Sequence, residues 1–299
     1  MKKVLIVGAT GQVGRELARA AWPAGLRPVI LDRFGLDVTD VARVRAVIAE
    51  QAPAVVVNAT AYTAVDKAES DAETAFAVNR DGPRALAEGC AAAGAALVHI
   101  STDYVFDGRK DGAWVESDPV APLGVYGASK AAGEQAVREA LPEAHVILRT
   151  AWVYSPFGGN FVKTMLRVGA ERDTLRVVAD QHGCPTAAGD IARAIVTLCD
   201  GIAAGRRDGF GTFHFAGAGP TTWHAFACAI FDLAARHGRK VPQVEAITTA
   251  EYPTPTTRPA NSVLDCTAIE RTWGIVPRPW RDALAEVIDE LLGKEGSAP

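Results

Sequence analysis

Short apolar runs alternate with longer segments of helical periodicity through the first half of the chain. Consecutive apolar residues, as expected of strands buried on both faces, occur at residues 4–7, 28–31, 54–58, 96–101 and 145–150. The segments between them place apolar side chains at helical spacing, at residues 15–20, 41–50, 69–91 and 126–141. Strands that alternate with helices in this way predict an α/β fold, with a parallel, doubly wound, Rossmann-like sheet over residues 1–150.

The rhythm of the pattern changes after residue 155. Helices are predicted at residues 161–170, 189–200, 222–237 and 280–292, with shorter strands at 175–178 and 211–215. No low-complexity linker separates the two halves. We therefore predict that residues 151–299 form a smaller α/β substrate-binding domain, interleaved with the first and returning some segments to it. The tail up to Pro299 is predicted to be frayed.

Composition argues against several classes of function. The 299 residues carry a net charge of −4 and contain no block of Lys or Arg, so we expect no nucleic-acid partner. The five cysteines are scattered without CxxC spacing, which fits a reducing compartment better than disulfide or zinc scaffolding. The first apolar run is too short for a signal peptide, and no run reaches membrane-spanning length. We therefore expect a soluble, cytoplasmic protein with no membrane partner.

A glycine-rich turn follows the first predicted strand. Gly8, Gly11 and Gly14 stand between the apolar run and the first helical segment, in GxxGxxG rather than GxGxxG spacing. Glycines in this place let the backbone turn tightly and approach a pyrophosphate, whose charge meets the helix N-terminus. This context predicts a dinucleotide site, and a purely structural turn is the alternative.

The second predicted strand ends at Asp32, which lies 24 residues after Gly8. A carboxylate at about this place binds the adenosine ribose hydroxyls in dinucleotide-binding folds. Arg33 follows, and a guanidinium here could accept the 2′-phosphate of NADP instead. The residues leave NADH and NADPH both open, and a helix cap or turn is the structural alternative for Asp32.

Candidate acid–base chemistry lies at Tyr126 and Lys130. Their spacing of four residues places both side chains on one face of a helix. Because an ammonium group stabilises a phenolate, Lys130 is expected to lower the Tyr126 pKa from its ordinary value of about 10. Thr102, at the end of the fourth predicted strand, is placed to hydrogen-bond a substrate carbonyl. An ordinary surface helix and a strand-end cap are the alternatives.

Several long motifs give these residues a specific context. They read STDYVFDG at 101–108, RTAWVY at 149–154, GNFVKTM at 159–165 and TPTTRP at 254–259. Together with the glycine turn, Thr102, Tyr126 and Lys130, they resemble the dTDP-4-dehydrorhamnose reductase family within the extended short-chain dehydrogenase/reductases. The resemblance runs from Lys3 to about Trp280.

The resemblance implies reduction of the C4 ketone of dTDP-4-dehydro-L-rhamnose by NADPH or NADH, giving dTDP-L-rhamnose. Tyr126 would donate the proton, Lys130 would hold the nicotinamide ribose, and Thr102 would hydrogen-bond the carbonyl. Further residues implied to contact the dinucleotide are Gly8, Gly11, Gln12, Val13, Gly14, Asp32, Asp37, Val38, Ala61, Tyr62 and Thr63. Residues implied to bind the dTDP-sugar substrate are Thr102, Asp103, Tyr104, Tyr126, Trp152 and Arg258.

Two of these implied roles have a particular form. Arg258 would hold the substrate diphosphate, because a planar guanidinium suits that group; a loop salt bridge is its alternative. Asn79 would help to anchor the helix that carries Tyr126.

Some members of this family form dimers around a magnesium ion held by glutamates. Glu16 is present here, but the second position reads Gly189-Asp190, with the acid displaced by one residue. A shared site for a hard cation needs several oxygen ligands. We therefore expect no metal-built dimer, and a monomer and a homodimer both stay open.

Two other functions stay open as well. A nucleotide-sugar epimerase or dehydratase of the same fold would also use a Tyr and a Lys. A dehydratase, however, would want an acid pair beside the hydroxyl residue, where Thr102-Asp103-Tyr104 supplies one acid. A non-catalytic, dinucleotide-binding regulatory subunit is the second alternative, against which the intact Thr102, Tyr126 and Lys130 argue.

Overall fold

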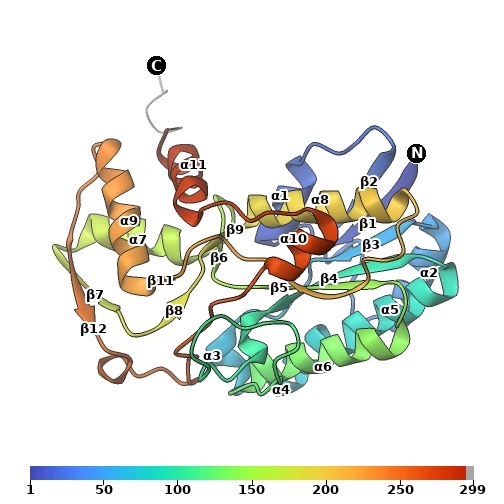
Figure 1. Ribbon diagram of the computed structural model, residues 1–299, viewed down its shortest axis with the longest axis horizontal. Coiled ribbons are helices and arrows are strands. Elements are labelled where there is room, and N and C mark those ends of the chain that lie inside the picture. Colours follow the sequence, from blue (N-terminus) through green and yellow to red (C-terminus); the bar gives the residue numbers. More distant parts are fainter. Residues whose placement is uncertain (294–299) are drawn as a thin grey trace.

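A six-stranded parallel sheet forms the centre of the computed structural model, which describes residues 1–293 (Figure 1). Its strands are β1 (Lys2–Val7), β2 (Leu26–Leu31), β3 (Val55–Asn58), β4 (Ala96–Thr102), β5 (His145–Thr150) and β10 (Gly211–His214). They lie in the order β10-β5-β4-β3-β1-β2, and every neighbouring pair is parallel. The strand order reverses between β1 and β3, which is where such sheets bind ligands. The prediction of a doubly wound sheet is confirmed.

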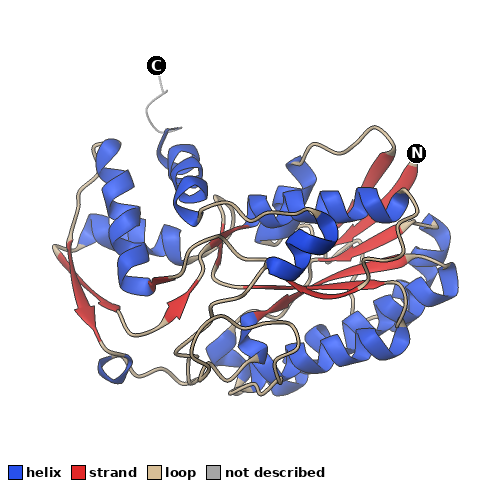
Figure 2. Ribbon diagram, in the orientation of Figure 1, coloured by secondary structure: helices blue, strands red, loops and turns tan. Residues whose placement is uncertain are grey.

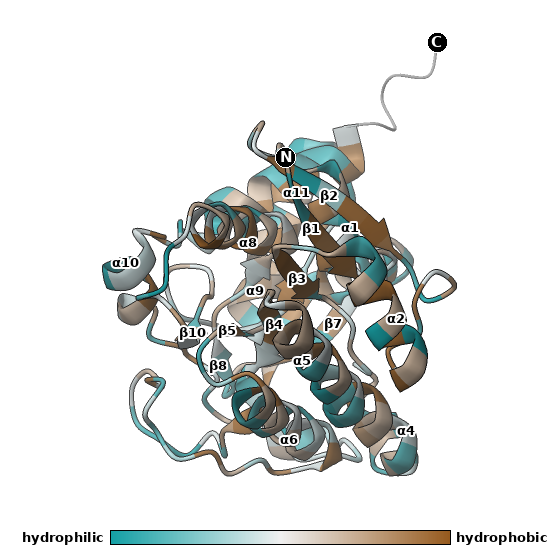
Figure 3. Ribbon diagram, turned by 90° about the vertical axis from the view of Figure 1, so that its right-hand side faces the viewer, coloured by the Kyte–Doolittle hydropathy of each residue, from teal (hydrophilic) through white to brown (hydrophobic). Residues whose placement is uncertain are grey.

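Helices cover both faces of this sheet (Figure 2). One face packs against α1 (Gln12–Arg19), α8 (Ala188–Ala203) and α10 (Thr267–Trp273). The other packs against α2 (Val41–Gln51), α5 (Gly82–Ala93) and α6 (Val125–Ala140). The strands are apolar on consecutive positions because successive side chains enter opposite cores. Ile6 therefore joins the first cluster and Leu5 the second, and apolar colour fills the middle of Figure 3.

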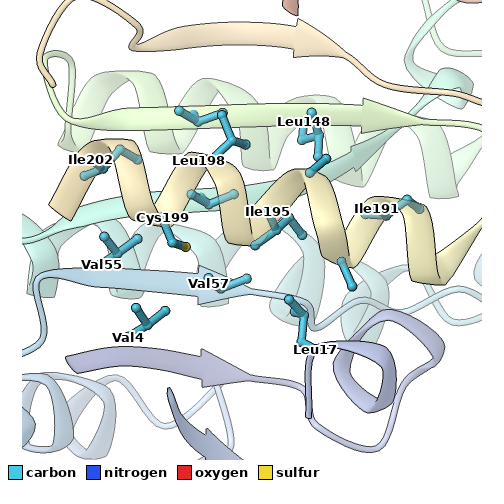
Figure 4. Close-up of a cluster of buried hydrophobic side chains, with 14 of the residues drawn as sticks. Val4, Leu17, Val55, Val57, Leu148, Ile191, Ile195, Leu198, Cys199 and Ile202 are labelled. Carbon is cyan, nitrogen blue, oxygen red and sulfur yellow. The ribbon is translucent and has the colours of Figure 1, made fainter. Parts of the chain in front are cut away.

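Segments from beyond residue 150 complete this first layer. The α8 side chains Ile191, Ile195 and Leu198 lie over Val55 and Val57 of β3 (Figure 4). Strand β10 extends the sheet beside β5. The C-terminal half thus supplies part of the N-terminal sheet and its cover, while the division into two domains at residue 150 stays a prediction.

A smaller group of elements lies beside the sheet, at the left of Figure 1. Its helices are α7 (Phe161–Glu171), α9 (Trp223–Arg236) and α11 (Trp280–Gly293), around a core that includes Tyr154, Phe226 and Trp280. Its strand pairs are β7 (Thr174–Val178) with β12 (Gln243–Ile247), β6 (Val153–Tyr154) with β9 (Thr186–Ala187), and β8 (His182–Gly183) with β11 (Thr221–Thr222). Strand β12 was not predicted, because its half-exposed residues make no apolar run.

The helix predicted at residues 69–91 is broken into pieces. The structure has α3 (Val65–Ala68), α4 (Ala72–Phe76), a π-helical turn (Ala77–Asp81) and then α5. Pro83 stands at the start of α5 and has no N–H to give to the preceding turn, so the regular hydrogen-bond ladder is interrupted there. The frayed tail predicted at 294–299 lies outside the described residues. None of the helices in residues 1–293 combines the length and apolar character that a membrane span requires.

Candidate active site

The glycine turn between β1 and α1 is shaped by close backbone contacts. Gly8 has a φ of +96°, and a Cβ there would lie 2.7 Å from the carbonyl carbon and oxygen of Ala59. A Cβ on Gly14 would lie 2.1 Å from the Gly8 oxygen. Glycine at both positions therefore lets α1 begin directly above β1 and lets a ligand approach the backbone.

Two adjoining cavities follow the carboxyl ends of the strands. The outer cavity, of about 430 Å³, and the inner cavity, of about 520 Å³, share Thr10, Gly11, Ala59, Thr60 and Ala61 in their walls. Together they form one long groove that crosses the point where the strand order reverses. A glycine cradle beside a helix N-terminus and a groove of this length fit a dinucleotide.

Helix α6 brings Tyr126 and Lys130 to the inner cavity. The helix is held close to its neighbours, since a Cβ on Gly127 would lie 2.2 Å from the Tyr104 oxygen. Asn79, in the π-helical turn, donates from Nδ2 to Ser129 Oγ at 3.0 Å and accepts from the Tyr62 N–H at 2.9 Å. The prediction that Asn79 anchors this helix is confirmed.

Burial governs the charge states of the pair. Burial raises the pKa of Tyr126, and a hydrogen bond with Thr102 opposes that shift. Burial also lowers the pKa of Lys130 to about 8, opposed by the charge of Glu134. Lys130 Nζ donates to the Ile100 carbonyl at 2.6 Å. The prediction that Lys130 lowers the Tyr126 pKa is wrong. The ammonium group is hydrogen-bonded to a strand carbonyl, and burial of the phenol is the largest influence on the Tyr126 pKa.

Polar side chains at the end of β4 surround the phenol of Tyr126. Thr102 Oγ1 donates to Asp103 Oδ1 at 2.9 Å and accepts from the Tyr104 N–H at 3.2 Å. The ring of Tyr104 meets that of Tyr126 edge-on, with centroids 5.4 Å apart. Asp103 is buried, and this burial raises its pKa to about 6.

A buried ion pair ties β4, β5 and α6 together behind the inner cavity. Arg149 donates to Glu134 through Nε at 2.8 Å and through Nη2 at 2.7 Å, and both residues are at most 2% exposed. Ser101 Oγ donates to the same carboxylate at 2.6 Å. Since Ser101 precedes Thr102 and Glu134 lies one turn beyond Lys130, the pair links the strand and the helix that carry the site.

Trp152 has an unusual backbone conformation at the wall of the inner cavity. Its φ is +48°, which is rare for a bulky residue and marks local strain. A Cβ on Gly183 would lie 2.3 Å from its ring, so only glycine leaves room for it. The backbone strain and the packing together turn a large aromatic side chain toward the groove.

The structure brings most of the predicted site residues into this groove. Those in the wall of the inner cavity are Gln12, Val13, Thr63, Thr102, Asp103, Tyr104, Tyr126, Lys130 and Trp152. Those in the wall of the outer cavity are Gly8, Asp37, Val38 and Tyr62, while Gly11 and Ala61 belong to both. Gly14, Asp32 and Arg258 line neither cavity.

Asp32 and Arg258 have the structural partners that were their alternatives. Asp32 Oδ1 accepts from the Gly35 N–H at 2.9 Å and closes a turn. Arg258 Nη2 pairs with Asp66 at 2.7 Å, and Nη1 donates to the Tyr104 hydroxyl at 3.3 Å. Arg258 therefore contacts Tyr104, which lines the inner cavity, but does not line the cavity itself.

Sequence reasoning missed several residues of the groove wall. Thr10 and Thr60 line both cavities, and Lys67 adds a cation to the outer one. Arg33, which the sequence offered as a possible partner of a 2′-phosphate, also lines the outer cavity. Thr60 is held by Asn58 Oδ1, which accepts from its N–H at 3.0 Å and from its hydroxyl at 2.6 Å. Thr10 and Thr60 could have been found from their position, since each lies just beyond the carboxyl end of a strand.

The residues expected around a family magnesium ion do not fit one here. Glu16 accepts from Ser155 Oγ at 2.8 Å and from Arg19 Nε at 2.6 Å. Asp190 is paired with Arg193 and with Arg278, whose Nε lies 2.9 Å from Oδ1. Within residues 1–293, no three His, Cys, Asp or Glu side chains are grouped as metal ligands. Arginine cations already neutralise the carboxylates that a hard cation would use.

Known proteins resemble the chain over almost all of its described residues. Residues 1–292 match the model of the RmlD substrate binding domain family. The chain is 46% identical over 290 residues to the dTDP-4-dehydrorhamnose reductase of Aggregatibacter actinomycetemcomitans, covering 96% of this chain and 98% of that protein.

Solved structures agree with this match. The structure of a dTDP-4-dehydrorhamnose reductase from Clostridium acetobutylicum has a TM-score of 0.90 and 41% identity, and the match covers 97% of this chain and 99% of that one. The corresponding reductase from Bacillus anthracis, solved in complex with NADP, has a TM-score of 0.88 and 37% identity, with coverage of 97% and 100%.

Proposed function

The chain belongs to the dTDP-4-dehydrorhamnose reductase family of extended short-chain dehydrogenase/reductases, and we propose that it reduces the C4 ketone of dTDP-4-dehydro-L-rhamnose. It is an NAD(P)H-dependent enzyme of dTDP-rhamnose synthesis. The observation that carries the proposal is the meeting of Tyr126, Lys130 and Thr102 in a cavity continuous with the glycine cradle. When bound there, the reduced nicotinamide supplies the hydride.

Tyr126 supplies the proton in this proposal. Burial keeps its phenol neutral, so a proton is in place when negative charge develops on the ketone oxygen. Lys130 would hold the nicotinamide ribose, and its cation would stabilise the phenolate left behind. Thr102 lies beside Tyr126 in the cavity wall, and its hydroxyl would hold the carbonyl in line for transfer once its proton is released from Asp103.

The sugar nucleotide would lie against the remaining wall of the inner cavity. Asp103, Tyr104 and Trp152 belong to that wall and offer a carboxylate and two aromatic rings to the hexose. Arg258 would exchange part of its pairing with Asp66 for the substrate diphosphate, whose planar bidentate contact suits a guanidinium.

The coenzyme would lie along the whole groove, from the outer cavity to the inner one. Gly8, Gly11, Gln12 and Val13 would hold the pyrophosphate, and the outer cavity would hold the adenosine of NADPH or NADH. The chain would act as a monomer or a homodimer without nucleic acid. Five free thiols support a reducing compartment such as the cytoplasm.

The proposal is tested by mixing the purified protein with dTDP-4-dehydro-L-rhamnose and each reduced coenzyme, and by following nicotinamide absorbance. We expect stoichiometric coenzyme oxidation and dTDP-L-rhamnose as product. Tyr126→Phe keeps the ring and removes the proton, so turnover should fall by about two to four powers of ten. Coenzyme binding to that variant should be unchanged.

Other outcomes would assign the chain elsewhere. Conversion of the sugar without net coenzyme consumption would indicate an epimerase or a dehydratase. Coenzyme binding without any conversion would indicate a non-catalytic subunit. Wild-type turnover in Tyr126→Phe would remove the phenol from the mechanism.

A further inference from the structure

The hydroxyl of Thr102 has a single proton, and the structure gives that proton to Asp103. Thr102 Oγ1 donates to Asp103 Oδ1 at 2.9 Å, while the Tyr104 N–H donates to Thr102 at 3.2 Å. The Thr102 side chain also acts on the neighbouring phenol, since it lowers the pKa of Tyr126. With its proton directed at Asp103, Thr102 has no proton to offer a substrate carbonyl.

Asp103 lies in a buried environment, in which its carboxylate is easily protonated. It is 3% exposed, and within the described residues its Oδ2 has no hydrogen-bond partner. Burial raises its pKa to about 6, against hydrogen bonds from Ser262 and Thr102. The titratable groups that face it are Tyr104, Tyr126 and Cys184, and the pKa of each is raised. These three stay neutral over the range in which Asp103 titrates.

We propose that Asp103 is a positioning residue that decides whether Thr102 can donate to the substrate ketone. When Asp103 is ionised, it accepts the hydrogen bond from the Thr102 hydroxyl, so that of Thr102 and Tyr126 only Tyr126 can donate to the carbonyl. Protonated Asp103 can donate to Thr102 Oγ1, and Thr102 is then free to turn its own proton to the carbonyl oxygen. The inference rests on the proposed function.

The chemical step stays balanced in both states of Asp103. The ketone carbon gains the hydride, and the ketone oxygen gains the Tyr126 proton as the phenol O–H bond breaks. The phenolate recovers a proton from solvent after the product leaves. Asp103 and Thr102 end the step as they began it. Protonation of Asp103 adds a second hydrogen bond to the oxygen on which negative charge develops, and it also removes a neighbouring negative charge.

The test is the pH dependence of kcat between about pH 5 and about pH 7, below the pKa of about 8 at which Lys130 loses its proton. In the wild type we expect kcat to rise by about tenfold as the pH falls through about 6, because one added hydrogen bond to a developing charge is worth about a power of ten or more. Asp103→Asn cannot titrate, so its profile should be flat. Thr102→Val keeps only the effect of the Asp103 charge, so its step should be much smaller, and Thr102→Ser, which keeps the hydroxyl, should restore the wild-type profile.

Three results would overturn the inference. If the wild-type kcat does not change with pH across this range, ionisation of Asp103 does not affect the reaction. A profile that keeps its step in Asp103→Asn would assign the step to another group. A step of full size in Thr102→Val would show that the Asp103 charge acts directly on the reaction. If Asp103→Asn does not fold, the two Thr102 variants decide the question by themselves.

Failure of the proposed function is distinguishable, since the wild type would then consume no coenzyme at any pH.

Discussion

Trp152 and Trp223 stack face to face, with ring centroids 3.6 Å apart and planes inclined by 11°. Trp152 belongs to the wall of the inner cavity, and Trp223 is the first residue of α9. The strained backbone of Trp152 is therefore supported by a side chain from the smaller group of elements. This contact joins the substrate end of the groove to the core around Phe226.

Trp223→Leu should therefore weaken substrate binding more than coenzyme binding. Loss of the stack is worth about 0.5–1.5 kcal/mol, so we expect KM for the dTDP-sugar to rise roughly two- to tenfold. The space left by the indole should also lower the free energy of unfolding by about 3 kcal/mol.

The measurements for Trp223→Leu are steady-state KM, the coenzyme Kd and urea unfolding. Trp22→Leu is the matched control, since Trp22 is also half-buried but lines neither cavity. It should lose stability without a change in KM. If the coenzyme Kd rises as much as KM in Trp223→Leu, the stack does not act on substrate binding separately from coenzyme binding.

Lys130 is held in the core at a cost to stability. Burial lowers its pKa from 10.5 to about 8, which corresponds to about 3 kcal/mol against the charged form. Because the pKa is lower in the folded state than in the unfolded state, the protein is free of this cost above the unfolded pKa of about 10.5. Stability is then lost progressively as the pH falls through about 8. Lys130→Met removes the charge, so it should unfold with a higher free energy than the wild type near neutral pH.

The difference between Lys130→Met and the wild type should shrink as the pH rises from about 7 to about 10. Urea unfolding at several pH values measures this trend. Turnover and coenzyme affinity of the variant should both fall, because Lys130 is proposed to hold the ribose. A stability difference that does not depend on pH would show that Lys130 keeps its charge through folding.

We expect the outer cavity to favour a cofactor with a phosphate on the adenosine ribose. Arg33 lines it and pairs with Asp37 at 3.1 Å, whereas the Asp32 carboxylate is turned into a hydrogen bond with Gly35. We expect Arg33→Ala to raise the Kd of NADPH by about tenfold and that of NADH much less, because the lost contact is a charged phosphate contact.

Asp32→Ala should show the opposite preference, with NADH use reduced more than NADPH use. Fluorescence titration with each coenzyme provides both values. Arg45→Ala is the matched control, since Arg45 is an exposed arginine that pairs with Glu88 and lines neither cavity. Equal losses for both coenzymes in Asp32→Ala would make Asp32 a structural residue.

The buried ion pair of Glu134 and Arg149 should be essential to folding stability. Burial opposes ionisation of Glu134, but the hydrogen bonds and charge of Arg149 lower its pKa below the ordinary value. Glu134→Gln leaves the Arg149 cation buried without its counter-charge, which costs about 3–5 kcal/mol. Glu139→Gln changes an exposed glutamate of the same helix and should stay within about 0.5 kcal/mol of the wild type.

Chemical denaturation of the two variants gives the comparison. Because Ser101 binds the same carboxylate next to Thr102, Glu134→Gln should also reduce kcat. Equal stability of the two variants would show that water or another group replaces the pair.

The sequence by itself determined the parts of this protein that depend on local pattern. Apolar runs predicted five strands of the parallel sheet, because its inner strands bury both of their faces, whereas β10 was expected in the second half of the chain. The glycine spacing located the cofactor cradle, since strand, turn and helix are neighbours in the chain. The spacing of Tyr126 and Lys130 placed them together because four residues make about one helical turn.

The tertiary structure decided what depends on burial and on contacts between distant segments. Sequence spacing predicted a lowered Tyr126 pKa, but burial raises it, and no local pattern reports how deeply a phenol lies. Trp223 reaches Trp152, and Arg258 reaches Asp66, only because chain segments far apart in the sequence fold against each other. The burial of Asp103 likewise decided the direction of the Thr102 hydrogen bond. A carboxylate that is shielded from water accepts a hydrogen bond from the nearest donor in the fold, which here is the Thr102 hydroxyl.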